Sequence, residues 1–305
     1  MFSRKTWAGA LAGCLAFSAA LCSTGWGATS GSHYNYGVEG VLGATAPPPG
    51  WHYRMYNLWY NPDTLKDNNG NTVPGNFELD VFASVQRIIH VTNTKILGAD
   101  YLYDVVVPLL DQDFTFGAFS DSHDFSIGDI EIEPFVLAWH QPRWDGVFGL
   151  AVILPTGHYE MTEPASPGLG YWSGRMTLGA TYYFDEQKTW SASVITRTLI
   201  NGEQEDTNIT PGSELVAEYG VGKEFHMNNW MIRPGITGAS YWQISDDSDE
   251  CATADQRKQA HAIGAELNLF YLPMLFQVNL RYLQEYGVEN GPEDSRFIAT
   301  LTKSW

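Results

Sequence analysis

The chain has little positive charge, few cysteines and no apolar run of helix-spanning length after its first 28 residues. It carries 17 Lys and Arg against 35 Asp and Glu, for a formal net charge of −18. This acidity argues against nucleic acid or an anionic lipid leaflet as a partner, because both attract clusters of Lys and Arg. The missing apolar runs exclude a helical membrane protein, but a membrane barrel needs apolar side chains on only one face of each strand.

The first 28 residues have the pattern of a secretory signal peptide. Arg4 and Lys5 form a positive n-region, residues 10–21 form an apolar h-region, and the small residues Gly25, Gly27 and Ala28 supply a cleavage site. The h-region is short for a membrane anchor, which needs ~20 apolar residues. We therefore expect a mature chain that begins near residue 29.

Processing would remove two of the three cysteines, Cys14 and Cys22, and leave Cys251 alone. No intrachain disulfide is then possible, and Cys251 is interpreted as an incidental loop thiol. The loss of two cations takes the formal net charge from −18 to −20. The alternative, that "LAGC" at 11–14 is a lipoprotein cleavage box, is disfavoured because more apolar residues follow it.

Apolar and polar residues alternate with period two along much of the mature chain, which is typical of β-strands with different solvents on their two faces. In the final segment Phe297 and Leu301 lie on one face, Thr300 and Thr302 lie on the other, and Trp305 ends the chain. Twelve segments either alternate in this way or are rich in aromatic and β-branched residues: 51–60, 78–91, 99–108, 129–139, 146–155, 174–184, 189–199, 214–225, 229–244, 262–271, 275–282 and 297–305.

The connections between these segments alternate between short turns and long polar stretches. The long ones are rich in Pro, Gly and Asp and occupy residues 61–77, 109–127, 156–171, 200–212, 245–255 and 288–294. Bacterial barrels have short periplasmic turns and long outer loops, and their strands close without an edge because unpaired backbone groups are costly in hydrocarbon. We predict an all-β fold, an antiparallel transmembrane β-barrel of about 12 strands over residues 51–305.

The segment at 78–91 is less regular than those of the second half. Arg87 falls on its apolar side, where we expect a β-bulge or a shift in register. A soluble β-sandwich can also alternate long and short loops. It would not need an aromatic residue at the end of the chain, so the barrel is favoured.

Aromatic residues mark the expected membrane interfaces. Four of them lie near turns or at the end of the chain, where girdles sit at headgroup level: Trp190, Trp230, Tyr271 and Trp305. Lys303 lies on the lipid side and can extend to the interface. The aromatic terminus resembles the signal that the outer-membrane assembly machinery reads, so that machinery is an expected partner, together with outer-membrane lipids and lipopolysaccharide.

Residues 29–50 form a short proline-rich lead-in before the first strand. Pro47, Pro48 and Pro49 cannot donate ladder hydrogen bonds and favour a polyproline II path, which excludes a central strand. We expect this stretch to be stiff and to pack at or inside the periplasmic mouth.

Charged residues on the polar faces of the strands are expected to line the lumen. They are Glu131, Glu133, Arg175, Arg197, Glu218, Arg233, Glu266, Arg281, Glu285 and Arg296. Two interpretations stay open: a polar conduit or selectivity ring, or ion pairs that fill the interior. A barrel of about 12 strands lies between small filled barrels and large open ones.

No segment carries a motif for catalysis, a cofactor or a metal, and none of these is predicted. His123 lies near Asp121 and Asp124, but such proximity is expected by chance among eight His and 35 acidic residues. The acidic run at 246–250 lacks the spaced ligands and Gly of a calcium loop, so we interpret it as a solvated loop.

Several motifs together resemble one family. They are "GVEGVLGATAPPPGWHY" at 37–53, "LKDNNGN" at 65–71, "ILGADY" at 96–101, "IGDIEIEPFVLAWH" at 127–140, "LPTGHY" at 154–159 and the terminal "TKSW". Over most of the mature chain the sequence resembles the SphA-like, "MetA-pathway of phenol degradation" family of outer-membrane transporters. The resemblance implies an integral barrel in the outer membrane of a Gram-negative cell, encoded beside the catabolism of aromatic or hydrophobic compounds, with an uptake role and no catalytic residues.

The predicted function is passive, substrate-selective passage of small hydrophobic or aromatic compounds through a polar lumen gated by loops. Aromatic residues of the outer loops are candidates for ligand capture: Phe114, Phe116, Phe119, Tyr159, Tyr171 and Trp172. An interfacial girdle or a loop core would use the same residues. The alternatives for the whole chain are an outer-membrane barrel hydrolase and a non-conducting structural or adhesive barrel.

Overall fold

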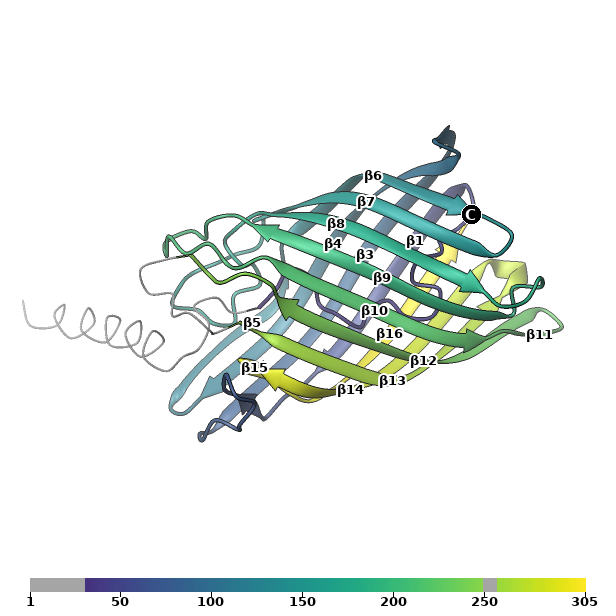
Figure 1. Ribbon diagram of the computed structural model, residues 1–305. Helices are drawn as coiled ribbons and strands as arrows, with labels where there is room; N and C mark the ends of the chain where they lie inside the picture. The colour runs from purple at the N-terminus through teal and green to yellow at the C-terminus, as the bar shows by residue number, and fades with distance from the viewer. Residues whose placement is uncertain (1–30, 249–256) are drawn as a thin grey trace, which may run out of the picture.

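The computed structural model describes residues 31–248 and 257–305, in which twelve antiparallel strands close into a barrel (Figure 1). The strands of the ring are β1 (Gly50–Tyr60), β3 (Phe77–Ile96), β4 (Ala99–Phe116), β6 (Ile130–His140), β7 (Trp144–Leu154), β8 (Ser173–Tyr183), β9 (Trp190–Asn201), β10 (Glu214–Lys223), β12 (Trp230–Gln243), β13 (Gln259–Tyr271), β14 (Phe276–Glu289) and β16 (Ser295–Ser304). The predicted signal peptide, Cys251 and part of the acidic run at 246–250 lie outside the described residues. The predicted fold is confirmed.

The first and last strands of the ring lie side by side. β1 pairs with β16 from His52 opposite Ser304 to Tyr60 opposite Arg296, and β10 pairs with β12 to complete the wall. Every ring strand therefore has two neighbours, as backbone groups in hydrocarbon require. In the described residues no helix is long and apolar enough to cross a membrane.

The two ends of the barrel differ. Short turns follow β3, β6, β8 and β13 at one end, here called the turn end, where Gly50 and Trp305 also lie; η1 (Leu272–Met274) is part of the last of these turns. β11 (Phe225–Met227) continues the wall there. The longer connections lie at the opposite loop end, with a small pairing of β2 (Leu65–Lys66) and β15 (Gly291–Pro292).

The stretch at 109–127 is not the long loop that we predicted. β4 continues to Phe116 and turns at Gly117, whose φ of 62° suits glycine. The chain returns as β5 (Phe119–Ile127), which pairs with β4. Polar and aromatic residues alternate in "DFTF" at 113–116, so period two persists beyond the ring as a projecting hairpin.

The outer face of the barrel is apolar in its middle and aromatic towards the turn end. Exposed aliphatic and other apolar side chains include Met176, Leu178, Val194, Ile236, Ile263 and Tyr282. Trp190, Trp230 and Trp305 are exposed at the turn end, and Tyr271 packs against Trp230 with ring centroids 4.7 Å apart. Exposed apolar side chains surround buried charges, which is the reverse of a soluble protein and the pattern of a membrane-spanning barrel.

A charge on the middle of this outer face should destabilise the barrel. Leu178 is 56% exposed at the centre of β8, so Leu178→Arg is expected to lower the free energy of unfolding. The expected loss is ~2–4 kcal/mol, measured by denaturant unfolding in lipid vesicles. Leu97→Arg is the matched control, because Leu97 is 84% exposed in the β3–β4 turn and should lose little. Equal losses at the two positions would contradict a lipid-facing band.

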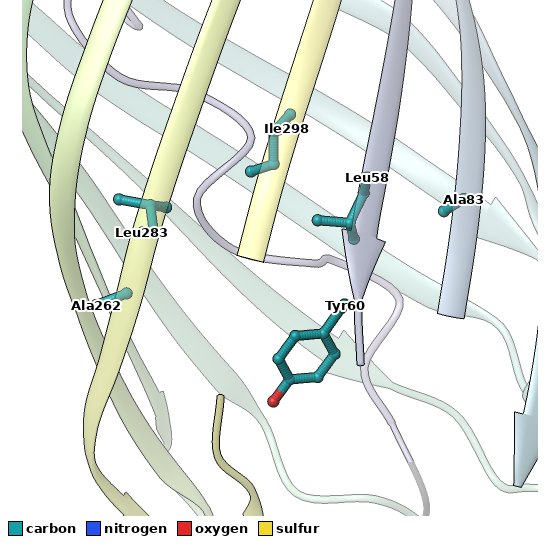
Figure 2. Packing of buried hydrophobic residues seen from close by; sticks show 6 residues of the cluster. All are labelled: Leu58, Tyr60, Ala83, Ala262, Leu283 and Ile298. Carbon is teal, nitrogen blue, oxygen red and sulfur yellow. The ribbon is translucent and has the colours of Figure 1, made fainter. Parts of the chain in front are cut away.

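The prediction of a β-bulge or a shift in register at Arg87 is wrong. Pairing between β3 and β4 is continuous from Phe77 to Val91, and the shift in register lies between Val91 and Lys95. Arg87 faces inward beside apolar residues because part of the inner wall is itself apolar. Figure 2 shows the buried cluster on that wall, which comes from five strands: Leu58, Tyr60, Ala83, Ala262, Leu283 and Ile298.

Candidate functional site

The lumen is occupied by the chain's own N-terminal segment. Residues 32–49, here called the N-terminal plug, run through the inside of the ring from the loop end to the turn end, where β1 begins at Gly50 (Figure 1). We predicted that this stretch would lie at or inside the periplasmic mouth. Its proline-rich end lies at the turn end, the end that our prediction assigns to the periplasm, with the Pro48 carbonyl 2.9 Å from His52 Nε2. The rest continues along the barrel because the inner wall offers it polar and apolar partners.

At the loop end the plug is held by His33. Its Nε2 lies 3.0 Å from Asp129 Oδ2, and its Nδ1 lies 2.7 Å from Ser173 Oγ. Asp129 also accepts hydrogen bonds from the backbone N–H groups of Gly157 and Leu169, at 2.9 and 2.8 Å. The entrance of the plug is therefore tied to the loop between β7 and β8.

In the middle of the barrel the plug is anchored on Glu218 of β10. The carboxylate accepts hydrogen bonds from the Tyr34 hydroxyl at 2.6 Å and from the N–H groups of Gly37 and Glu39 at 2.7 and 2.9 Å. It also accepts one from Arg197 of the wall at 2.6 Å. Wall and plug thus share one buried carboxylate.

Glu39 carries the plug's own negative charge into a group of arginines. Its Oε1 lies 3.4 Å from Arg54, 3.8 Å from Arg87 and 3.9 Å from Arg197. These arginines come from β1, β3 and β9, so one plug carboxylate contacts three separate parts of the wall. Such buried charges are stable only when they are paired.

A second polar anchor for the plug lies on β16. Arg296 Nη1 donates to the Asn35 side chain at 2.5 Å and to the Tyr36 carbonyl at 2.9 Å. Its guanidinium lies 4.1 Å from the ring centroid of Tyr36 and 4.5 Å from that of Tyr60. Arg296 also pairs with Glu285, which accepts a hydrogen bond from the Tyr36 hydroxyl as well.

The plug has glycine where the wall comes closest. A Cβ on Gly40 would lie 1.9 Å from Glu266 Oε2, and Gly37 has φ of +90°. A larger residue at Gly40 would collide with the carboxylate that receives the Val41 N–H at 3.0 Å. The spacing in "YGVEGVLG" therefore fits this lumen.

Further ion pairs join the wall strands beside the plug. Arg87 donates to Asp104 and Glu133 at 2.7 and 2.8 Å, and Arg175 donates to Glu131 and Glu133 at 2.6 and 3.2 Å. A cavity of about 60 Å³ lies between this network and the plug. Its lining is amphipathic, with charged side chains and apolar ones: Glu39, Arg54, Arg87, Glu133, Arg197, Ile89, Leu102, Val136, Val147 and Ile195.

Nine of the ten residues predicted to line the lumen are buried: Glu131, Glu133, Arg175, Arg197, Glu218, Glu266, Arg281, Glu285 and Arg296. Arg233 is only half-buried and pairs with Glu224 near the turn end. The position of these nine charged residues on the polar faces of regular strands was enough to predict that they point inward. In this arrangement they form ion pairs that, with the plug, fill the interior.

The six aromatic candidates for ligand capture fall into different settings at the loop end. Phe114, Phe116 and Phe119 lie on the β4–β5 hairpin, and Tyr159 is half-buried against Gly170. Tyr171 is buried and packs on His33, with ring centroids 4.6 Å apart, whereas Trp172 is exposed. Only part of the set is therefore available to a ligand from outside.

Sequence reasoning missed Glu39, Arg54 and Arg87. The last two lie in strands of mixed polarity, and Glu39 lies in a stretch with no strand pattern. No local pattern in "GVEG" marks this carboxylate as a buried one. Two of the residues that lie together near His123 in the sequence have separate partners. His123 contacts Glu163 at 3.3 Å, and Asp121 accepts the N–H of Ala165 at 2.9 Å.

The family described as "Putative MetA-pathway of phenol degradation" matches residues 62–301. Among solved structures, the COG4313 outer membrane channel from Pseudomonas putida F1 has a TM-score of 0.72 at 15% identity, over 90% of this chain and 100% of that chain. The β-domain of the Bordetella autotransporter Brka has a TM-score of 0.52 at 12% identity, over 85% of this chain and 100% of that chain. These two likenesses show the barrel fold. None of the curated proteins matches the chain.

Proposed function

Because the chain belongs to the MetA-pathway of phenol degradation family, we propose that it is an outer-membrane channel of a Gram-negative cell for the uptake of small hydrophobic or aromatic compounds. The family description associates its members with phenol degradation, and the similarly folded COG4313 protein is named an outer membrane channel. The observation that carries the proposal is a barrel whose lumen is filled by a non-covalently held segment, which can move without any break in the wall.

Passage of an aromatic compound requires the N-terminal plug to move. The cavity beside Glu39 is about 60 Å³, whereas a protein cavity that holds benzene is roughly 150 Å³. A shift of the plug would enlarge this cavity between the arginines and the apolar side chains of Ile89 and Leu102. The ring of an aromatic compound would then contact the apolar side chains of the cavity, and a hydroxyl group on that ring would contact the charged side chains. On the outside, Phe114, Phe116, Phe119 and Trp172 offer aromatic surface for a first encounter.

The same proposal gives the barrel its other partners. Its apolar outer face would contact outer-membrane lipids and lipopolysaccharide, and the terminal Trp305 would be read by the assembly machinery. These roles rest on the barrel surface and the aromatic end of the chain.

A hydrolase is the alternative that one cluster could favour, since Ser173, His33 and Asp129 lie in a row. Ser173 is 0% exposed, and its hydroxyl donates to Asn201 Oδ1 at 2.6 Å. A serine whose proton points to an amide oxygen is not activated by the histidine, and no substrate reaches it. The cluster is better explained as the anchor of the plug.

Locking the plug to the wall should abolish uptake. The Ala44 N–H donates to Ser193 Oγ at 3.2 Å, so these two residues are in contact and form the candidate cysteine pair. In a Cys251→Ser background, the Ala44→Cys/Ser193→Cys variant should fail to restore growth of a deletion strain on limiting phenol. Purified protein in planar bilayers should regain its openings when a reductant is added.

The two single-cysteine variants are the matched controls and should restore growth. Full rescue by the locked variant, with the disulfide shown by mass spectrometry, would mean that the plug need not move. Normal growth of the deletion strain would count against uptake itself.

A further inference from the structure

Two histidines and a glutamate meet at the loop end, outside the lumen. His123 lies on β5, and His158 and Glu163 lie in the loop between β7 and β8. Glu163 Oε2 is 2.9 Å from His158 Nε2 and 3.3 Å from His123 Nε2. One ligand atom from each residue lies within 4.8 Å of the other two.

These donors and spacings suit a zinc-like cation. Zn²⁺ takes imidazole nitrogen at about 2.0–2.1 Å and carboxylate oxygen at about 2.0–2.2 Å, so neighbouring ligands of a tetrahedral site are about 3.3 Å apart. Of the three separations, one is 3.3 Å and a second, at 2.9 Å, is slightly shorter than that. All three side chains are partly exposed, which leaves a path for the ion and room for water as a fourth ligand.

The backbone around the cluster is held independently of any ion. The Ala165 N–H donates to Asp121 at 2.9 Å, which fixes the loop against the β4–β5 hairpin. Ser166 Oγ donates to the Glu163 carbonyl at 2.7 Å, and the Glu163 N–H donates to the Glu160 carbonyl at 2.9 Å. The three donors are therefore brought together by the loop fold, and small side-chain rotations would complete the site.

Glu163 offers the same carboxylate oxygen to both histidines. Hydrogen bonds from His158 and His123 lower its pKa below the usual value. A carboxylate and two imidazoles are the ligand set of many zinc sites with an open position.

We propose that His123, His158 and Glu163 bind Zn²⁺ or a similar divalent transition-metal ion, which fastens the β7–β8 loop to the β4–β5 hairpin. The same loop supplies the Gly157 and Leu169 N–H groups that hold Asp129, the partner of His33 in the plug. Metal binding would therefore stiffen the part of the mouth at which the plug enters. The site does not depend on what the barrel transports.

Isothermal titration of tag-free, EDTA-treated, folded barrel with Zn²⁺ tests the site. We expect one strong site per chain, and a loss of affinity of more than an order of magnitude in His123→Ala, His158→Ala and Glu163→Gln. His226→Ala is the matched control, because His226 Nε2 also contacts a glutamate, Glu224, at 2.9 Å, and no second histidine of the described residues joins this pair. Heat-modifiable electrophoretic mobility shows whether each variant is folded.

Limited proteolysis gives the second readout. Zn²⁺ should slow cleavage within residues 155–172 of the wild type and of His226→Ala, but not of His158→Ala. Absent binding, or equal binding by the wild type and the three site variants, would overturn the site and show that the histidines only hydrogen-bond Glu163. Zn²⁺ binding without any protection of the loop from cleavage would contradict the proposal that the metal fastens the β7–β8 loop to the β4–β5 hairpin.

Discussion

Replacing residues 33–46 of the N-terminal plug with a Gly/Ser linker of equal length is expected to raise the single-channel conductance by an order of magnitude or more. The plug runs through the lumen from His33 to the prolines near the turn end, and the cavity beside it at Glu39 has a volume of about 60 Å³. Twelve strands enclose more space than the filled eight-stranded barrels, so an empty lumen should conduct ions. The measurement is single-channel recording in planar bilayers.

The variant must first be shown to fold. Residues 33–46 take no part in the strand pairings that close the ring, and the wall pairs Arg197–Glu218 and Arg296–Glu285 stay in place. Heat-modifiable mobility and strand content by circular dichroism check this. Glu39→Gln is the milder companion, because it removes the charge that faces Arg54, Arg87 and Arg197, and it should increase only the frequency of openings. An intact barrel with unchanged conductance would show that the outer loops, and not the plug, close the channel.

Glu218→Ala is expected to lower the free energy of unfolding by ~3–5 kcal/mol, because it leaves Arg197 buried without its closest carboxylate. Glu218 is 0% exposed and also receives the Tyr34 hydroxyl and the Gly37 and Glu39 N–H groups. Loss of these contacts should also raise the open probability. Denaturant unfolding in lipid vesicles and single-channel recording measure the two effects.

Glu203→Ala is the control, since Glu203 is exposed in the β9–β10 connection and should change stability little. If the alanine variant does not fold, Glu218→Gln keeps an acceptor oxygen for the plug and should be affected less. A cycle with Arg197→Met isolates the coupling between the two charges. Additive losses of unfolding free energy in that cycle would contradict the proposal that Glu218 anchors both the wall and the plug. A smaller loss for Glu218→Ala than for Glu203→Ala would contradict it as well.

The regular strands could be predicted because their signal is local. In β8, Met176 and Leu178 face lipid while Arg175 and Thr177 face inward, and each side chain's neighbours in sequence are enough to show the alternation. The same holds for the last strand, where Phe297 faces out and Thr300 and Thr302 face in. The nine buried charges followed from that rule alone.

The rule failed where the inner wall does not meet water. Ala83, Leu283 and Ile298 are apolar and face inward because they pack beside the plug residues Tyr36 and Val38. Polarity in the sequence records whether a face is wet, and a lumen filled by peptide is partly dry. The prediction of a loop at 109–127 failed for a different reason. The strands of this hairpin continue beyond the ring into water, where period two no longer separates a lipid face from a lumen face.

The amino-acid sequence by itself determined the barrel, its strand number, the lipid-facing band and most of the charges inside, because period two and the closure of backbone hydrogen bonds are properties of neighbouring residues. Only the tertiary structure decided that the segment before β1 runs through the lumen. Glu39 meets arginines from β1, β3 and β9, and Glu218 binds a segment that lies far from it in the sequence. Such contacts depend on which strands the closed ring brings to the same depth, and no local pattern records that.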